Sequence, residues 1–325
     1  MSSLISVNNL TRHYGDFCAV DNISFELAGG DILGFLGPNG AGKTSTMQML
    51  SGNLAPTFGE ISINGIDLLE SPKAAKASLG YLPENPPLYK EMTVMEFLQY
   101  CGRLHLIKKS QLGKMCDSAI ERCGLGDVRQ RLIRNLSKGY QQRVGIAQAI
   151  LHSPAVIILD EPTVGLDPIQ ILEIRQLMKM LGETHGIILC THILPEVQAV
   201  CNRVQIINQG NLVYSSSIDE LLNKQSTRYE ISLVSYVDEE KLASHDAFSN
   251  IERIDDHNFI ADTELSAEQL TAYIVQQEWG LTRFAPRQKS LEQIFIDITA
   301  GDTSITEENL GDESLQTAAL KENRL

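Results

Sequence analysis

A stretch of eight residues near the N-terminus combines glycine, lysine and threonine at a spacing suited to binding phosphate. The run is Gly37-Pro38-Asn39-Gly40-Ala41-Gly42-Lys43-Thr44, and Ser45 follows it. Glycines let backbone N–H groups close around phosphate oxygens, because no Cβ stands in the way. Lys43 is placed to reach the β- and γ-phosphates of a nucleotide, and the Thr44 hydroxyl is a ligand for Mg²⁺. The pattern is that of a P-loop and predicts a nucleotide site over residues 37–45.

The segments on either side of this P-loop predict the elements that must position it. Residues 31–36 are mostly apolar and predict a strand that enters the loop, and residues 44–50 predict a helix that leaves it. Gly52 lies just past the end of that helix, where a glycine commonly ends one. A helix N-terminus offers free N–H groups and the positive end of a dipole to an anion. This context favours a P-loop over a chance glycine turn before a helix.

Further along the chain, acidic residues and a histidine follow two apolar runs. Asp160 and Glu161 come directly after the run 155–159, and His192 lies just beyond the run 187–190. A carboxylate at the end of a buried strand can hold Mg²⁺ or its water, which is the role we expect for Asp160. Glu161 can polarise the water that attacks a γ-phosphate, and His192 can orient that water. The alternatives are a helix cap or loop charge for the acidic pair and a structural role for the histidine.

Four motifs in register resemble those of the ATPase subunits of ABC transporters. They are the P-loop, the run Leu136-Ser137-Lys138-Gly139-Tyr140-Gln141-Gln142-Arg143, the run Val156-Ile157-Ile158-Leu159-Asp160-Glu161-Pro162, and Thr191-His192. The resemblance covers roughly residues 4–219. It implies that the chain binds ATP with Mg²⁺, hydrolyses ATP, and works as a dimer of two copies that closes on two nucleotides.

The resemblance also implies roles for residues outside the P-loop. Ser137 and Gly139 match the family's signature loop, which begins a helix that faces the ATP of a second subunit. Asp167 ends the run Val164-Gly165-Leu166-Asp167, which resembles the loop that joins the two sites across the dimer. Tyr14 resembles the aromatic residue that stacks on adenine, with a tyrosine in a surface turn as the alternative.

Two departures from the family pattern lie near these sites. The usual signature has Gly-Gly-Gln after the serine, whereas this chain has Lys138-Gly139-Tyr140. Glu84 stands where the family usually places a glutamine that touches Mg²⁺ and the membrane subunit. Its oxygens can still ligate metal, so we expect Glu84, Thr44 and Asp160 to share the ion.

Three short runs resemble those of the gliding-motility-type group of ABC-2 exporters. They are Leu82-Pro83-Glu84-Asn85-Pro86-Pro87-Leu88-Tyr89, Leu136-Ser137-Lys138-Gly139-Tyr140 and Ser290-Leu291-Glu292-Gln293-Ile294-Phe295. In that group a small C-terminal domain follows the ATPase core, which is the arrangement we expect here.

Composition limits the class of protein and its partners. The 325-residue chain carries 27 basic and 41 acidic residues, for a net charge of −14. That balance argues against wrapping nucleic acid and against binding anionic lipid by charge alone.

No apolar segment approaches the roughly 18 residues that a membrane span needs, and no secretory signal is visible. Six cysteines without a C-x-x-C pair fit a reduced, cytoplasmic setting and predict no zinc site.

Apolar strands alternating with helices predict an α/β fold of the P-loop NTPase type, with a parallel sheet covered on both faces. We expect antiparallel strands at residues 5–9, 23–27 and 59–63. A helical lobe is expected at residues 92–134, opened by a capping box of Thr93 and Glu96.

The composition also predicts three parts along the chain. They are an ATPase domain at residues 1–222, a small α+β domain at 228–300 and a flexible acidic tail at 301–325. Within the small domain we expect a strand at 228–234, a hairpin of strands 251–254 and 259–262, and two helices opened by Ser266 and Ser290.

Together these inferences favour the ATP-hydrolysing subunit of an ABC-2-type exporter, peripheral on the cytoplasmic face of the membrane and driving separate multi-pass membrane subunits. We expect those subunits to dock in the groove near Glu84 and on the helical lobe. One alternative is a soluble ABC ATPase that acts on ribosomes or DNA, which the acidic charge and single cassette disfavour. The other is a nucleotide-sensing module without turnover, which Glu161 and His192 disfavour. The sequence does not indicate the transported molecule.

Overall fold

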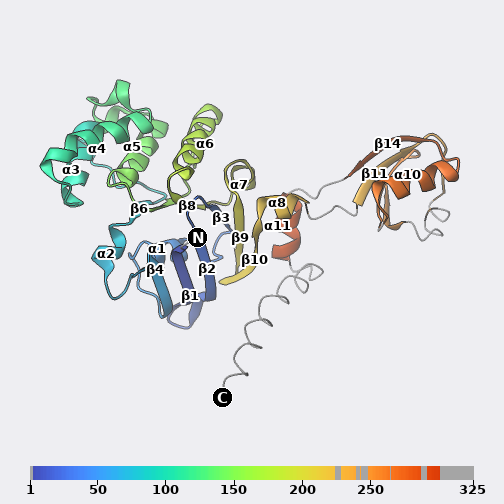
Figure 1. Cartoon of the computed structure of the whole chain (residues 1–325), viewed down its shortest axis with the longest axis horizontal. Helices are drawn as coiled ribbons and strands as arrows, with labels where there is room; N and C mark the ends of the chain where they lie inside the picture. Colours follow the sequence, from blue (N-terminus) through green and yellow to red (C-terminus); the bar gives the residue numbers. More distant parts are fainter. Residues whose placement is uncertain are drawn as a thin grey trace, which may run out of the picture. The chain divides into compact units, whose positions relative to one another are not determined.

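The predicted P-loop follows a strand of a six-stranded sheet in the larger of two units (Figure 1). The computed structural model describes residues 3–223, 228–238, 242, 248–263, 265–286 and 291–300. The first unit comprises the described residues up to Ile218 and those from Asp297 onward, and the second comprises those within Asp219–Ile296.

Five parallel strands make up most of the large sheet. The order is β10-β9-β3-β8-β7-β6, with β10 antiparallel to β9 at one edge. The bounds are β3 Ile32–Leu36, β6 Leu79–Leu82, β7 Val156–Asp160, β8 Gly186–Cys190, β9 Arg203–Asn208 and β10 Asn211–Ser217. All residues of β3, β7 and β8 are buried, and apart from Asp160 at the end of β7 these strands carry no charged side chain, as expected for a sheet covered on both faces. The predicted parallel sheet is confirmed.

The large sheet is covered on both faces, as predicted. On one face, Leu33 and Ile188 belong to a buried cluster that also contains Met47 of α1 (Lys43–Leu50). On the other face, α7 (Leu194–Val200) lies close to β3, since a Cβ on Gly34 would come within 2.6 Å of Val197. Helix α6 (Pro168–Gly182) packs beside α7 and β8.

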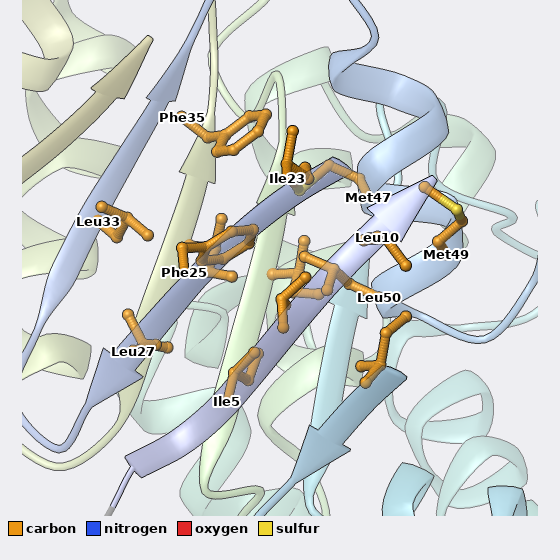
Figure 2. Close-up of a cluster of buried hydrophobic side chains, with 14 of the residues drawn as sticks. Ile5, Leu10, Ile23, Phe25, Leu27, Leu33, Phe35, Met47, Met49 and Leu50 are labelled. Atoms are coloured by element: carbon orange, nitrogen blue, oxygen red, sulfur yellow. The ribbon is translucent and has the colours of Figure 1, made fainter. Parts of the chain in front are cut away.

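A four-stranded antiparallel sheet, in the order β2-β1-β4-β5, supplies much of the buried cluster. Its strands are β1 Ser3–Tyr14, β2 Phe17–Ala28, β4 Phe58–Ile63 and β5 Ile66–Asp67. Figure 2 shows side chains of β1 and β2, among them Ile5, Leu10, Ile23 and Phe25, together with Leu33 and Phe35 of β3 and Met47, Met49 and Leu50 of α1. This packing holds the helix that leaves the P-loop against two sheets.

Strands β1 and β2 are longer than the sequence predicted. The prediction ended the first strand at Asn9, but β1 continues past it through a register shift between Val7 and Leu10. Asn9 and Asn22 both have positive φ, and the Asn9 side-chain amide donates to Asn22 Oδ1 at 2.8 Å. A β-bulge therefore absorbs the asparagines, which are residues that tolerate the left-handed region.

The helical lobe contains α3 (Val94–Leu104), α4 (Lys109–Arg122) and α5 (Lys138–Ile150). The predicted capping box is confirmed, because Thr93 Oγ1 accepts from the Glu96 N–H and Glu96 Oε2 accepts from the Thr93 N–H. The remaining helical segments of the first unit are α2 (Pro72–Lys76) and the 3₁₀ turns Gly126–Val128 and Ile133–Asn135. Among the described residues, no helix is long and apolar enough to cross a membrane.

The second unit is a four-stranded antiparallel sheet with a helix. The strands are β11 Arg228–Leu233, β12 Ser249–Arg253, β13 Asn258–Asp262 and β14 Leu281–Pro286, in the order β12-β13-β11-β14. Helix α10 (Ala267–Gln276) begins with the expected capping box of Ser266 and Gln269, and the expected hairpin is formed by β12 and β13. Strand β14 was not predicted. The core contains Phe248, Phe259 and Trp279.

The chain changes units within two helices. Helix α8 (Ile218–Asn223) crosses the division between Ile218 and Asp219, slightly before the predicted boundary. Helix α11 (Leu291–Ala300) enters the first unit at Asp297, whereas the sequence assigned all of residues 228–300 to the small domain. Asn208 of β9 donates a hydrogen bond to the Thr299 carbonyl at 3.4 Å, which ties the end of α11 to the first unit. Ser290 and the predicted tail at 301–325 lie outside the described residues.

Candidate functional site

A cavity of about 490 Å³ opens where the P-loop meets the carboxyl ends of β7 and β8. Its lining includes eleven residues that the sequence analysis singled out: Tyr14, Asn39, Gly40, Gly42, Lys43, Thr44, Ser45, Glu84, Asp160, Glu161 and His192. Phe17, Ala19 and Val164 complete the lining. Gly37, Pro38 and Ala41 belong to the same loop but do not line the cavity. The fold therefore gathers residues up to 178 positions apart (192 − 14) around one space.

Two glycines of the P-loop are required by close backbone contacts. A Cβ on Gly37 would lie 2.3 Å from the Ile207 carbonyl oxygen, and one on Gly42 would lie 2.5 Å from the Ala19 carbonyl oxygen. Gly42 also has a φ of 109°, which L-residues with a side chain rarely adopt. Gly42 is the N-cap of α1, so these contacts fix the direction in which the first N–H groups of the helix point.

The Lys43 side chain lies inside the loop rather than in solvent. Its Nζ donates to the carbonyl oxygens of Gly37 at 2.7 Å and Pro38 at 3.1 Å. Lys43 is buried, and carbonyl partners compensate its charge only in part. The ammonium group is thus held at the cavity wall by backbone carbonyl oxygens.

Asp160 is the last residue of β7 and is 4 % exposed. Burial raises the pKa of its carboxyl, and the negative charges of Glu161 and Glu84 raise it further. A side-chain hydrogen bond with Cys190, its partner in the parallel β7–β8 register, and the charge of Lys43 act in the opposite direction. A cation in the cavity offsets the cost of this buried negative charge, which is the property expected of a metal ligand.

Glu161 is held by two side chains at the end of β8. His192 Nδ1 lies 2.7 Å from Glu161 Oε1, and the Thr191 hydroxyl donates to Glu161 Oε2 at 3.2 Å. Because an ionised carboxylate only accepts hydrogen bonds, Nδ1 carries the proton and Nε2 remains for a ligand. Glu161 itself has a φ of 48°, so the backbone turns sharply as it leaves β7. The geometry orients a carboxylate and an imidazole as one unit.

A second cavity, of about 420 Å³, contains the other predicted residues. It is lined by Gly124, Ser137, Gly139, Tyr140, Arg143, Asp167, Ile169, Gln170 and Glu173. Ser137 is the N-cap of α5 and accepts from the Tyr140 N–H, while Asp167 caps α6 and accepts from the Gln170 N–H at 2.9 Å. Ser137, Gly139 and Asp167 therefore do not join the P-loop residues within one chain.

Lys138, which departs from the expected signature, lies over the loop that ends at Asp167. A Cβ on Gly165 would come within 2.2 Å of Lys138 Nζ, and Gly165 has a φ of +73°. The glycine thus leaves the space that the lysine side chain fills. The signature helix and this loop are packed together through that contact.

Known proteins resemble this chain over most of its length. Residues 20–164 match the family model described as ABC transporter. The chain is 32% identical to the uncharacterized ABC transporter ATP-binding protein YxlF of Bacillus subtilis (strain 168), over 91% of this chain and 99% of that protein. It is 33% identical to the bacitracin transport ATP-binding protein BcrA of Bacillus licheniformis, over 93% of this chain and 99% of BcrA.

The chain is an ATP-binding subunit of the ABC transporter family. The solved structure of CbiO1 from Clostridium perfringens, part of the ABC transporter complex cbiONQ, has a similar fold. Its TM-score is 0.62 at 27% identity, over 68% of this chain and 91% of CbiO1. The P-loop NTPase fold and ATP hydrolysis by an ABC ATPase follow from this membership.

Three residues that line the ABC ATPase cavity were not predicted as site residues, namely Phe17, Ala19 and Val164, and of these Phe17 is the aromatic one. Phe17 is 62 % exposed and lines the same cavity as Tyr14, which is 44 % exposed. The Arg12 guanidinium lies 4.7 Å from the centre of the Tyr14 ring, and Tyr14 Oη lies 3.5 Å from Ser45 Oγ. In the sequence, Phe17 could have been noticed as a second aromatic residue three positions after Tyr14. Its spacing alone does not show that it lines the cavity.

Proposed function

We propose that this ABC ATPase drives an ABC-2-type exporter from the cytoplasmic face of the membrane. Two copies close on two ATP molecules, and hydrolysis reopens them to move separate multi-pass membrane subunits. The observation that carries the proposal is the Glu161–His192 pair, which shares a cavity with Lys43 and Asp160. This arrangement fits an ATPase that turns over better than a module that only senses a nucleotide.

The P-loop residues are proposed to hold the triphosphate. The N–H groups at the start of α1 surround phosphate oxygens, and Lys43 Nζ binds the β- and γ-phosphates after leaving the Gly37 and Pro38 carbonyls. Tyr14 stacks on adenine, and Phe17, from the same turn, adds a second aromatic wall.

The oxygen donors in the cavity fit Mg²⁺. Thr44, Glu84 and Asp160 line it together, and Asp160 is a buried carboxyl whose pKa is raised by burial and by the charges of Glu161 and Glu84, despite the opposing charge of Lys43. The described residues contain no cluster of three His, Cys, Asp or Glu side chains that could hold a metal by themselves. Mg²⁺ commonly uses one or two carboxylates plus substrate phosphates, so this donor set suits an ion that arrives with ATP. When bound, Mg²⁺ neutralises charge on the β- and γ-phosphates.

Glu161 is proposed to accept a proton from the attacking water. Its carboxylate is oriented by His192 and Thr191, so it does not have to reorganise when the water is polarised. His192 Nε2 is proposed to contact the γ-phosphate and fix the line of attack.

A second copy is proposed because the two cavities are separate within one chain. Ser137 and Gly139 lie at the N-terminus of α5 and offer N–H groups to phosphate, as α1 does. The residues that line this second cavity include no lysine. Because this cavity has no lysine to bind the β- and γ-phosphates, we propose that it contacts an ATP molecule whose phosphates are bound by the P-loop of another copy.

Membrane subunits are the proposed partners. CbiO1 is described as part of an ABC transporter complex, and BcrA is named for bacitracin transport, which supports a role with transporter partners. The proposed docking surface is the exposed stretch around Glu84 and the adjoining lobe formed by α3 and α4.

A pull-down with tagged Glu161→Gln protein, in ATP and Mg²⁺, tests the proposal. The substitution keeps the shape of the cavity but removes the general base, so the closed ATP-bound dimer accumulates and carries its membrane partner. The expected result is one polytopic membrane protein that depends on ATP. Recovery of ribosomal or DNA-associated material instead would refute the exporter proposal.

A further inference from the structure

Glu196 is a fully buried carboxyl that does not line either cavity. It lies in the first turn of α7 and is 0 % exposed. Its Oε1 accepts a short hydrogen bond from the Thr163 hydroxyl, which is also buried. Its Oε2 has no hydrogen-bond partner among the described residues, and neither does the buried Nε of Arg175 on α6.

The two bonded residues belong to the two segments that carry the proposed reaction. Thr163 lies two positions after Glu161, and the turn between them is closed by the Val164 N–H, which donates to the Glu161 carbonyl at 3.3 Å. The next turn is closed by the Leu166 N–H, which donates to the Thr163 carbonyl at 3.2 Å. Thr163 therefore lies between two consecutive hydrogen-bonded turns of the loop from Glu161 to Asp167.

On the other segment, Glu196 is tied to the chain that leaves β8. The Glu196 N–H donates to the Ile193 carbonyl at 3.0 Å, and the Ile193 N–H donates to Thr191 Oγ1 at 3.1 Å. Thr191 in turn donates to Glu161. The Thr163–Glu196 bond thus closes a ring of contacts around the Glu161–His192 pair.

Removing a carboxyl group from water has an unfavourable free energy, so a buried glutamate is an unusual contact between a helix and a loop. Burial raises the pKa of Glu196, while the hydrogen bond from Thr163 and the charge of Arg175 oppose that rise. Apolar side chains of similar volume commonly stabilise such a contact as well or better. The hydrogen bond, however, fixes a direction and a spacing that apolar packing does not.

We infer that Glu196 is a positioning residue for ATP hydrolysis. Its bond with Thr163 fixes α7 relative to the loop 161–167 and so sets the spacing of Glu161 and His192. The inference rests on the proposed roles of those two residues. It does not depend on which membrane subunit the ATPase drives.

The test measures kcat, KM for ATP and the melting temperature of Thr163→Val, Thr163→Ser and Glu196→Leu. Thr163→Val and Glu196→Leu are expected to lower kcat about tenfold or more, because small misplacements of reacting groups have large effects on rate. KM is expected to stay within about twofold, since neither residue lines the nucleotide cavity. Thr163→Ser keeps the hydroxyl and should restore kcat.

A double-mutant cycle separates positioning from general damage. If the bond acts as one unit, the Thr163→Val and Glu196→Leu double variant loses no more kcat than either single variant. Glu183→Leu, an exposed change at the end of α6, is the matched control and should leave kcat unchanged.

Two outcomes would overturn the inference. One is a melting temperature that falls while kcat stays within twofold of wild type; the other is a fully additive cycle. If Glu196→Leu does not fold, Thr163→Val and Thr163→Ser carry the test. Glu161→Gln is assayed in parallel, because retained turnover there would refute the proposed catalytic role and not the Thr163–Glu196 contact.

Discussion

The two cavities are built on the same local feature and differ in what surrounds it. Each lies at the N-terminus of a helix, α1 in the first cavity and α5 in the second. The first adds Lys43 at the start of α1, a buried Asp160 at the end of β7, and the Glu161–His192 pair just beyond β7 and β8. In the second, Ser137 and Asp167 are occupied in capping their own helices.

The comparison shows why a helix N-terminus does not make a complete site. Free N–H groups attract phosphate, but bond cleavage also needs a cation, a base and a metal ligand held in fixed places. In the first cavity the cation comes from the start of α1, and the acids and histidine come from the ends of β7 and β8. We propose that another copy brings these groups to the second cavity, and four experiments test that difference.

The largest effect is expected for Glu161→Gln. The substitution removes the base but keeps the hydrogen-bonding shape, so kcat should fall by about 10² or more while ATP still binds. Steady-state turnover and nucleotide binding measured on the same preparation check this result. Glu183→Gln is the control, because Glu183 is exposed and lines neither cavity. A twofold change in kcat would contradict the assignment of the first cavity.

A mixing experiment asks whether the two cavities complete each other in trans. Ser137→Arg should block the second cavity and Lys43→Ala should disable the first, so each variant alone is expected to have little turnover. When the two are mixed, a heterodimer combines the intact P-loop of one copy with the intact Ser137 of the other. Turnover above that of either variant is expected. No recovery across a range of ratios would argue against a site shared between copies.

Removing the Tyr14 ring tests the adenine side of the first cavity. Tyr14→Ala should raise KM for ATP about five- to tenfold with little change in kcat, because stacking on an aromatic contributes about 1 kcal/mol or more per base and Phe17 still lines the cavity. Tyr14→Phe keeps the ring, loses only the long contact with Ser45, and serves as the control. Equal KM values for wild type and Tyr14→Ala would leave Phe17 as the adenine contact.

The smallest effect is a gain in stability. Asp160→Asn should raise the melting temperature of the nucleotide-free protein by about 2–4 °C, equivalent to about 1 kcal/mol, because it removes a buried negative charge. The pKa of Asp160 is raised on folding, so the folded state binds its proton more readily, and the destabilisation that Asp160 contributes at neutral pH is lost as pH falls. The difference between the two proteins should therefore shrink from neutral pH towards acidic pH.

Thermal melts without nucleotide from neutral to acidic pH check this prediction. The same variant should lose Mg²⁺-dependent turnover at neutral pH, which separates the structural cost of Asp160 from its proposed chemical use. A lower melting temperature for Asp160→Asn would show that the carboxylate stabilises the empty site.

Local patterns made several elements predictable. The P-loop, the buried strands that end at Asp160 and Cys190, and the capping boxes at Thr93 and Ser266 depend on residues close together in the chain. Such signals act within a few residues, so they can be read without knowing the partners. Strand β1 was predicted too short because the strand continues past Asn9 through a register shift against β2, which the local pattern does not indicate.

Features that depend on packing between distant segments were not predictable. Phe17 belongs to a turn whose place against the P-loop is decided by the packing of two sheets on α1. The end of α11 was assigned to the small domain because its apolar stripe does not reveal which unit it contacts. The structure ties it to β9 through Asn208 and Thr299.

The chemical groups of the site and their order along the chain could be recognised from local sequence patterns. Glycine spacing, a lysine at a helix start and acids after apolar runs follow from local conformational preferences and need no partner to be recognised. Only the tertiary structure decided that Ser137 and Asp167 lie apart from Lys43, and that Glu196 bonds Thr163 across 33 positions. Contacts of that kind depend on how β7, α6 and α7 pack, because burial and hydrogen-bond geometry are set by several segments at once.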